Sequence, residues 1–125
     1  MPRDPFTFTG RLRSFRDAFH GLWIMLRSQH NAWIHALATV VVVGGGIATG
    51  LNRFEWCWIV LAIGAVWTAE ALNTALELLA DAASPEYHPL VGKAKDVAAG
   101  AVLVTALGAV LVAVVIFGPH LVGWP

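Results

Sequence analysis

Two long stretches of this chain contain no Asp, Glu, Lys or Arg: one lies between Ser28 and Asn52, and the other follows Asp96. Within them, segments 32–51 and 97–117 are almost wholly apolar, and each has about the 20 residues that a helix needs to cross roughly 30 Å of hydrocarbon. Charged residues make up 13% of the chain, about half the share usual in soluble domains. The sequence therefore predicts membrane spans at 32–51 and 97–117.

A third segment, 56–80, is also long enough to cross a membrane, although it carries acidic side chains. At 100° per residue, its polar residues fall within an arc about 100° wide, opposite lipid-compatible residues. We call this set the polar stripe; its members are Glu70, Asn73, Thr74, Glu77 and Asp81. A span that stops near residue 69 and continues as a soluble helix is the alternative, but the one-sided arrangement favours a single continuous helix. A carboxylate in hydrocarbon costs roughly 2.5–3.5 kcal/mol, so the stripe must face other helices, water or a substrate.

The segment before the first span has a different pattern. Over residues 10–28, apolar side chains such as Phe15 and Phe19 occupy one stripe and arginines lie opposite, which is typical of an amphipathic helix in the membrane interface. A cleaved signal peptide is the alternative, but the basic region is too long and no small-residue cleavage site follows. We therefore expect an all-α membrane protein with an N-terminal surface helix and three membrane spans. Residues 1–9 would be a flexible N-terminus and residues 10–125 one domain.

The distribution of basic residues predicts the orientation in the membrane. Five arginines precede the first span and two lysines lie in the loop 82–96, whereas only Arg53 lies between the first two spans. The excess of basic residues marks the cytoplasmic side, so the N-terminus and the second loop should be cytoplasmic and the C-terminus outside. A net charge of 0 argues against a nucleic-acid partner, and the single Cys57 excludes a disulfide framework.

The polar residues on the cytoplasmic side are suited to phosphate chemistry. Acidic residues of the polar stripe lie near Lys93 and Lys95, and Mg²⁺ is usually held by one or two carboxylates together with substrate phosphates. Phosphoryl transfer also needs a base for the attacking hydroxyl. Taken alone, these residues are equally compatible with proton or ion conduction along the stripe, in a non-catalytic membrane protein.

Three motifs carry a resemblance to a known family: Glu70-x-x-Asn73-x-x-x-Glu77, then Glu86-Tyr87-His88, then Ala94-Lys95-Asp96. With these motifs, the chain resembles the prokaryotic diacylglycerol kinase and undecaprenol kinase family over about residues 10–117. Two segments, the loop 84–90 and the run 95–103, look more like the undecaprenol kinase branch of the family than the diacylglycerol-specific branch. The resemblance implies a homotrimeric lipid kinase of the bacterial inner membrane that moves the γ-phosphate of ATP to a lipid hydroxyl, with Mg²⁺, at sites between subunits.

The resemblance also implies roles for individual residues. Glu70 would be the general base, Asn73 would help to position the site, and Glu77 would bind the metal. Contacts with lipid would come from Glu70, Ala99 and Ser14. The residues implied for the nucleotide are Lys95, Asp96, Glu86, Tyr87, His88, Asp17, Asp81 and Arg11.

One position departs from the family pattern. A second metal-binding glutamate is expected just before the first span, and Gln29 occupies that place. Its amide oxygen can bind Mg²⁺ without adding charge, so we expect weaker metal affinity unless Asp17 or Asp81 compensates. His35, in the first span, is expected to be a polar packing residue.

Overall fold

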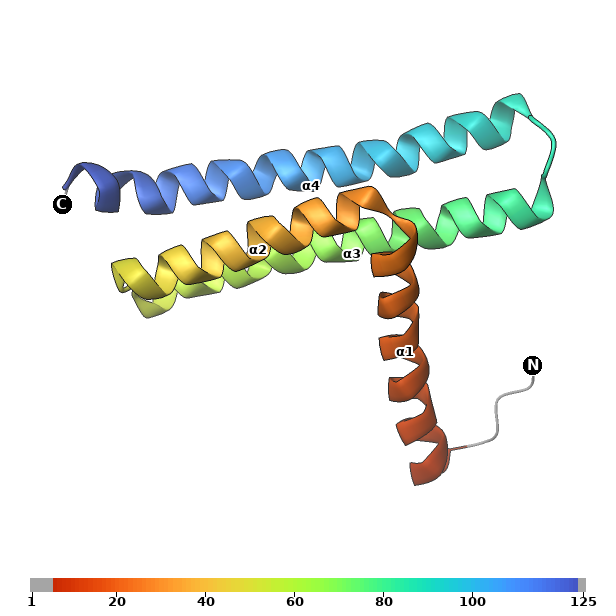
Figure 1. Cartoon of the computed structure of the whole chain (residues 1–125), viewed down its shortest axis with the longest axis horizontal. Coiled ribbons are helices and arrows are strands. Elements are labelled where there is room, and N and C mark those ends of the chain that lie inside the picture. Colours follow the sequence, from red (N-terminus) through yellow and green to blue (C-terminus); the bar gives the residue numbers. More distant parts are fainter. Residues whose placement is uncertain (1–5, 124–125) are drawn as a thin grey trace.

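The computed structural model describes residues 6–123, and this part of the chain forms four helices and no strand (Figure 1). They are α1 (Phe8–Ser28), α2 (His30–Thr49), α3 (Arg53–Ala83) and α4 (Pro89–Val122). The last three are long and apolar enough to cross a membrane. The prediction of an all-α membrane protein with three spans is thus confirmed.

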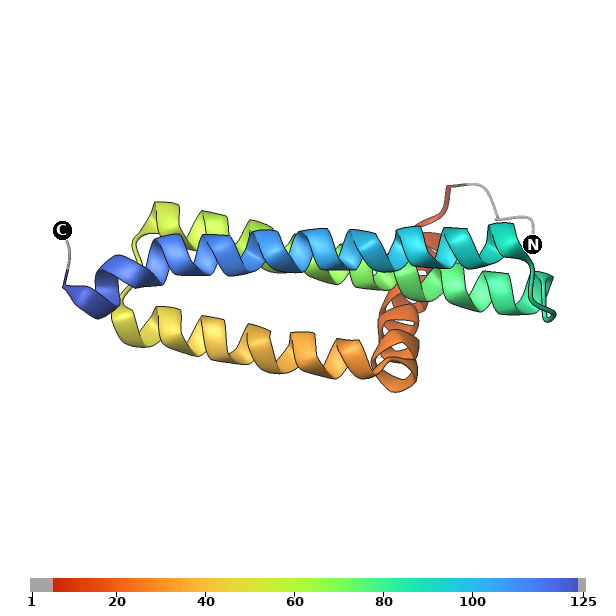
Figure 2. The same ribbon diagram turned by 90° about the horizontal axis from the view of Figure 1, so that it is seen from above.

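Helix α1 lies crosswise to the bundle formed by the other three helices (Figures 1 and 2). It begins two residues earlier than the predicted start at Gly10, because the Thr7 hydroxyl accepts a hydrogen bond of 3.0 Å from the Gly10 amide and caps the helix. Residues 8 and 9 are therefore helical, which corrects part of the flexible segment predicted for 1–9; residues 1–5 lie outside the described part. Most large apolar side chains of α1, among them Phe15 and Phe19, are exposed, whereas Met25 is buried; exposed apolar side chains are expected of a helix that rests on a bilayer surface.

The turn between α2 and α3 is set by a glycine. Gly50 adopts a left-handed conformation with φ of 71°, and its amide bonds to the carbonyl of Gly46. Helix α2 therefore ends at Thr49, two residues before the predicted end of the span at 51. Helix α3 starts with a capping box in which the Asn52 side chain and the Glu55 side chain each accept the other residue's amide hydrogen.

The connection between α3 and α4 is shorter than predicted. It covers only residues 84–88, and Pro89 starts α4 in the first helical turn, where its missing N–H costs nothing. Lys93, Lys95 and Asp96 therefore lie on α4 and not in a loop over 82–96. With 31 and 34 residues, α3 and α4 are about 46 and 51 Å long, so both extend beyond roughly 30 Å of hydrocarbon.

Helices α3 and α4 run antiparallel and side by side, and α2 lies on one flank of the pair (Figures 1 and 2). A small cluster of Leu51, Ile59 and Ile116 is buried at the end away from the α3–α4 connection. Outside it, large apolar side chains such as Val40 and Leu111 are exposed. A soluble protein would not leave such faces uncovered, so lipid or other subunits must cover them.

Candidate active site

Helix α3 buries the deeper part of the polar stripe. Glu70, Asn73 and Thr74 are 0%, 6% and 3% exposed, although they lie within a membrane span. The Thr74 hydroxyl donates a 2.9 Å hydrogen bond to the carbonyl oxygen of Glu70. This part of the stripe is thus buried against other helices, which is one of the three environments expected for it.

The Glu70 carboxylate has no hydrogen bond within residues 6–123. Both of its oxygens are buried without a partner, and so is the amide oxygen of Asn73. Buried polar atoms nearly always find a partner, because an unpaired one costs about 1–3 kcal/mol and a charged one more. Acceptors left open in this way are suited to a hydroxyl group that arrives with a substrate.

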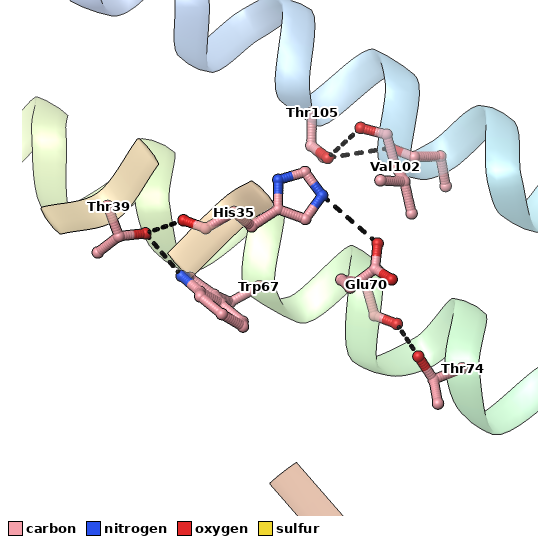
Figure 3. Close-up of polar contacts among 8 residues, drawn as sticks. His35, Thr39, Trp67, Glu70, Thr74, Val102 and Thr105 are labelled. Carbon is pink, nitrogen blue, oxygen red and sulfur yellow. Dashed lines mark hydrogen bonds and ion pairs between the residues drawn. The ribbon is translucent and has the colours of Figure 1, made fainter. Parts of the chain in front are cut away.

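His35, expected from the sequence to be a polar packing residue, lies against Glu70 in the structure. Its Nε2 lies 3.5 Å from Glu70 Oε2, with side-chain exposures of 14% and 0% (Figure 3). The contact joins α2 to α3, and the spacing of residues along one helix contains no information about which residue of another helix it will face.

The His35 ring is held by its neighbours. It meets the Trp67 ring edge-on, with centroids 6.4 Å apart and planes at 68°. The Trp67 indole N–H donates to the Thr39 hydroxyl at 3.0 Å, and that hydroxyl donates to the carbonyl oxygen of His35 at 2.7 Å (Figure 3). The Trp67 and Thr39 side chains thus fix the backbone and one side of the ring together.

Gln29 and Glu77 meet at the junction of α1 and α2 with α3. The Gln29 side-chain amide donates a 3.1 Å hydrogen bond to Glu77 Oε2, and both residues are half-buried. These are the two residues predicted as metal ligands, and they are 48 positions apart in the sequence. The structure therefore brings the two predicted metal ligands into contact.

Asp81 and Lys95 form the outermost pair. Lys95 Nζ lies 2.6 Å from Asp81 Oδ1, and the pair links the last turns of α3 to the first turns of α4. Lys95 precedes the apolar segment 97–117, and its hydrogen bond to Asp81 raises the pKa of its ammonium group. Lys95 therefore places a positive charge at the end of the bundle that carries the α3–α4 connection.

The remaining predicted residues are not gathered at the stripe. Glu86, Tyr87 and His88 are exposed in the α3–α4 connection, where His88 caps α4 by accepting the Leu90 amide hydrogen. On α1, Asp17 pairs with Arg16 at 4.0 Å and Arg11 stacks over Phe6 at 4.3 Å. Three further predicted residues are also exposed: Ser14, Asp96 and Ala99.

The three acidic residues Glu70, Glu77 and Asp81 form a series along α3. From Glu70 to Glu77 the helix rises about 10 Å, and from Glu77 to Asp81 another 6 Å. The series thus runs from an unpartnered buried carboxylate, through a half-buried carboxylate–amide pair, to an exposed ion pair with a cation. A lipid hydroxyl at the inner end and phosphates at the outer end would match this gradient.

A groove of about 460 Å³ lies beside the inner end of the series, between α3 and α4. Small side chains line most of it, including Ala65, Ala69, Ala98 and Ala101, and Asn73 also borders it. Ala99, predicted to contact lipid, is not among the lining residues. An apolar groove bordered by a polar side chain such as that of Asn73 can hold a hydrocarbon chain with a polar head.

Among the described residues, no group of three or more His, Cys, Asp and Glu side chains is arranged to hold a metal ion. This fits Mg²⁺ bound with a nucleotide, since that ion usually takes one or two carboxylates and completes its shell with phosphates and water. Glu77 offers a carboxylate, and the Gln29 side chain whose amide nitrogen donates to it also carries an amide oxygen. The donors present are therefore sufficient for a nucleotide-bound Mg²⁺ but not for a metal held by protein alone.

Comparison with known proteins assigns the family. Residues 16–117 match the family described as prokaryotic diacylglycerol kinase. The chain is 39% identical over 109 residues to the undecaprenol kinase of Bacillus subtilis (strain 168), covering 87% of this chain and 89% of that protein. It is 33% identical over 122 residues to the diacylglycerol kinase of Escherichia coli (strain K12), covering 90% and 94%. A diacylglycerol kinase of Synechocystis sp. is 38% identical over 102 residues, which are 81% of this chain but 58% of that protein.

These matches agree with the resemblance carried by the Glu70–Glu77, Glu86–His88 and Ala94–Asp96 motifs, all of which lie within the matched residues. The fold has the membrane helices that a kinase acting on lipids requires. The chain belongs to the prokaryotic diacylglycerol kinase family and is a membrane lipid kinase.

Proposed function

We propose that this kinase transfers the γ-phosphate of ATP to the hydroxyl of undecaprenol, with Mg²⁺ as its cofactor. The choice of undecaprenol is supported by the 39% identity to an undecaprenol kinase over most of both chains. Diacylglycerol is the second candidate acceptor, because the other two relatives described above are named diacylglycerol kinases. Both acceptors present a primary hydroxyl group on an apolar body.

The observation that carries the proposal is the buried carboxylate of Glu70, whose two oxygens have no hydrogen-bond partner within residues 6–123. In this reaction Glu70 takes the proton of the lipid hydroxyl while the oxygen attacks the γ-phosphorus, and ADP leaves. The Asn73 amide, also unsatisfied at its oxygen, orients the hydroxyl. The adjoining groove between α3 and α4 takes the hydrocarbon chain.

The residues proposed to bind the nucleotide and the metal are assigned from their charges and donor atoms. Lys95 would contact the phosphates, and Glu77 with Gln29 would hold Mg²⁺, which when bound supplies positive charge to phosphate oxygens. Asp81 orients Lys95 through their 2.6 Å contact. The exposed residues predicted for the nucleotide lie on α1, in the α3–α4 connection and at the start of α4, and they would complete the site when ATP binds. They are Arg11, Asp17, Glu86, Tyr87, His88 and Asp96.

A homotrimer in the bacterial inner membrane would cover the exposed apolar faces of the helices and let one subunit complete the site of another. The N-terminus and the α3–α4 connection would face the cytoplasm, which is the side that supplies ATP. Seven of the eight basic residues lie on that side in this orientation.

The test is a membrane preparation of the chain supplied with labelled ATP, Mg²⁺ and a panel of lipid alcohols. We expect label in undecaprenol, little in diacylglycerol, and none in either lipid for Glu70→Gln. Label in diacylglycerol alone would mean that diacylglycerol, and not undecaprenol, is the acceptor. If no lipid acquires phosphate while Glu70→Gln alters proton leak, the chain is a proton pathway and the kinase mechanism fails.

A further inference from the structure

Within residues 6–123, a ring nitrogen of His35 and the buried carboxylate of Glu70 face each other without forming a hydrogen bond. His35 Nε2 and both carboxylate oxygens of Glu70 are unpartnered, yet Nε2 and Oε2 are only 3.5 Å apart. Contacts of this kind in a site without its substrate often shorten when the substrate complex forms. The imidazole is the titratable side chain closest to the proposed base.

The surroundings of Glu70 offer its carboxylate few partners other than His35. On α3, Asn73 and Thr74 lie one turn from Glu70 and are neutral, and among the described residues the ion pair that Glu70 makes is with His35. Figure 3 shows uncharged side chains, Val102 and Thr105, on the α4 segment drawn in the same view. The Thr105 hydroxyl is already bonded to the carbonyl oxygens of Ala101 and Val102. No second charged side chain of the described residues therefore competes for the Glu70 carboxylate at this depth.

We propose that His35 is the positioning residue for the base of this kinase, an inference that rests on the proposed function. Its Nε2–H donates to Glu70 Oε2, which fixes the carboxylate and turns Oε1 toward the lipid hydroxyl. During transfer the O–H bond of the alcohol breaks and its proton goes to Oε1. The alcohol oxygen bonds to the γ-phosphorus as the bond from that phosphorus to ADP breaks, and His35 keeps its own proton.

The anchoring of the ring supports this role. Thr39 and Trp67 hold the backbone and edge of His35, so the imidazole reaches Glu70 from a fixed position on α2. A base that is held in one rotamer is more effective than a mobile one, since misplacement by about 1 Å can cost roughly 100-fold in rate. The contact also couples the position of α2 to the base on α3.

The experiment measures kcat, KM for the lipid alcohol and KM for ATP in the purified protein and in three variants. We expect His35→Leu, which keeps most of the volume but cannot donate, to lower kcat about 10- to 100-fold with little change in KM for ATP. His35→Gln keeps an N–H donor and should regain part of the rate. His20→Leu, on the exposed surface of α1, is the matched control and should behave like the wild type.

Two further readouts separate positioning from packing. Added imidazole should raise the rate of His35→Ala and leave the wild type unchanged. The ¹⁵N chemical shift of His35 Nε2 should differ between the wild type and Glu70→Gln, and this holds whether or not the protein turns over.

The outcomes are distinct. If the wild type phosphorylates no lipid alcohol, the proposed function fails and the role of His35 fails with it. An active wild type with an equally active His35→Leu overturns the role of His35 alone. Equal losses in His35→Leu and His35→Gln, without rescue by imidazole, would mean that His35 only fills space. An unchanged ¹⁵N shift in Glu70→Gln would show that the two side chains do not interact.

Discussion

Replacing Gln29 by glutamate tests the metal end of the site most directly. In the wild type, the Gln29 amide donates to Glu77 Oε2 at 3.1 Å. Gln29→Glu removes that charge-assisted hydrogen bond, worth about 1.5–3 kcal/mol, and places a second negative charge beside the first. Two such charges about 4 Å apart repel by roughly 4 kcal/mol at an effective dielectric constant near 20, and less where water reaches the half-buried pair. Without metal, the variant should therefore be less stable by about 2–5 kcal/mol.

Divalent metal should reverse the sign of this effect. A cation between the two carboxylates turns their repulsion into attraction, and binding to the folded state alone raises stability by mass action. We expect the half-saturating Mg²⁺ concentration for lipid phosphorylation to fall at least about tenfold, which corresponds to roughly 1.4 kcal/mol. The melting temperature should be lower than that of the wild type in EDTA and closer to it, or higher, in Mg²⁺.

The assay is a Mg²⁺ titration of turnover, together with thermal unfolding in detergent with EDTA and with Mg²⁺. Ser28→Glu is the matched control, because it adds the same charge one residue away at an exposed position whose hydroxyl bonds to the carbonyl oxygen of Ile24. The reasoning is refuted if Gln29→Glu and Ser28→Glu give the same Mg²⁺ titration as the wild type. The Gln29–Glu77 pair would then be a structural contact and the metal would bind elsewhere.

Three further predictions concern other parts of the chain. Glu70→Gln should abolish lipid phosphorylation and leave ATP binding nearly unchanged in a direct nucleotide-binding assay, because the base acts on the acceptor; equal turnover would exclude it as the base. Gly46→Ala should destabilise the protein by about 1–3 kcal/mol in thermal unfolding, since a Cβ there would lie 2.7 Å from Trp56 Cη2, whereas Gly44→Ala meets nothing within 4 Å and should be neutral or stabilising. His120→Ala, which removes the 2.8 Å contact with Glu55 at the other end of the bundle, should lower the melting temperature less than Gly46→Ala does, because a partly exposed polar contact contributes little.

Much of the fold could be predicted because the membrane limits the alternatives. Charge-free apolar segments of the required length must be helices where no water can satisfy the backbone, and α2 and α4 contain the predicted segments almost entirely. The ends were less predictable, since they depend on caps: Thr7 starts α1 early, Gly50 ends α2 early, and Pro89 makes the α3–α4 connection short.

The helices, the one-sided polar stripe on α3 and the motifs of the family can be read from the amino-acid order alone, because all of these follow from spacing along a single chain segment. The contacts of Gln29 with Glu77, of Lys95 with Asp81 and of His35 with Glu70 became visible in the folded chain. Periodicity fixes which residues share a face of one helix, whereas packing between helices fixes their relative rotation and depth. The contacts that give the site its chemistry lie between helices, and that relation is absent from the pattern of any one of them.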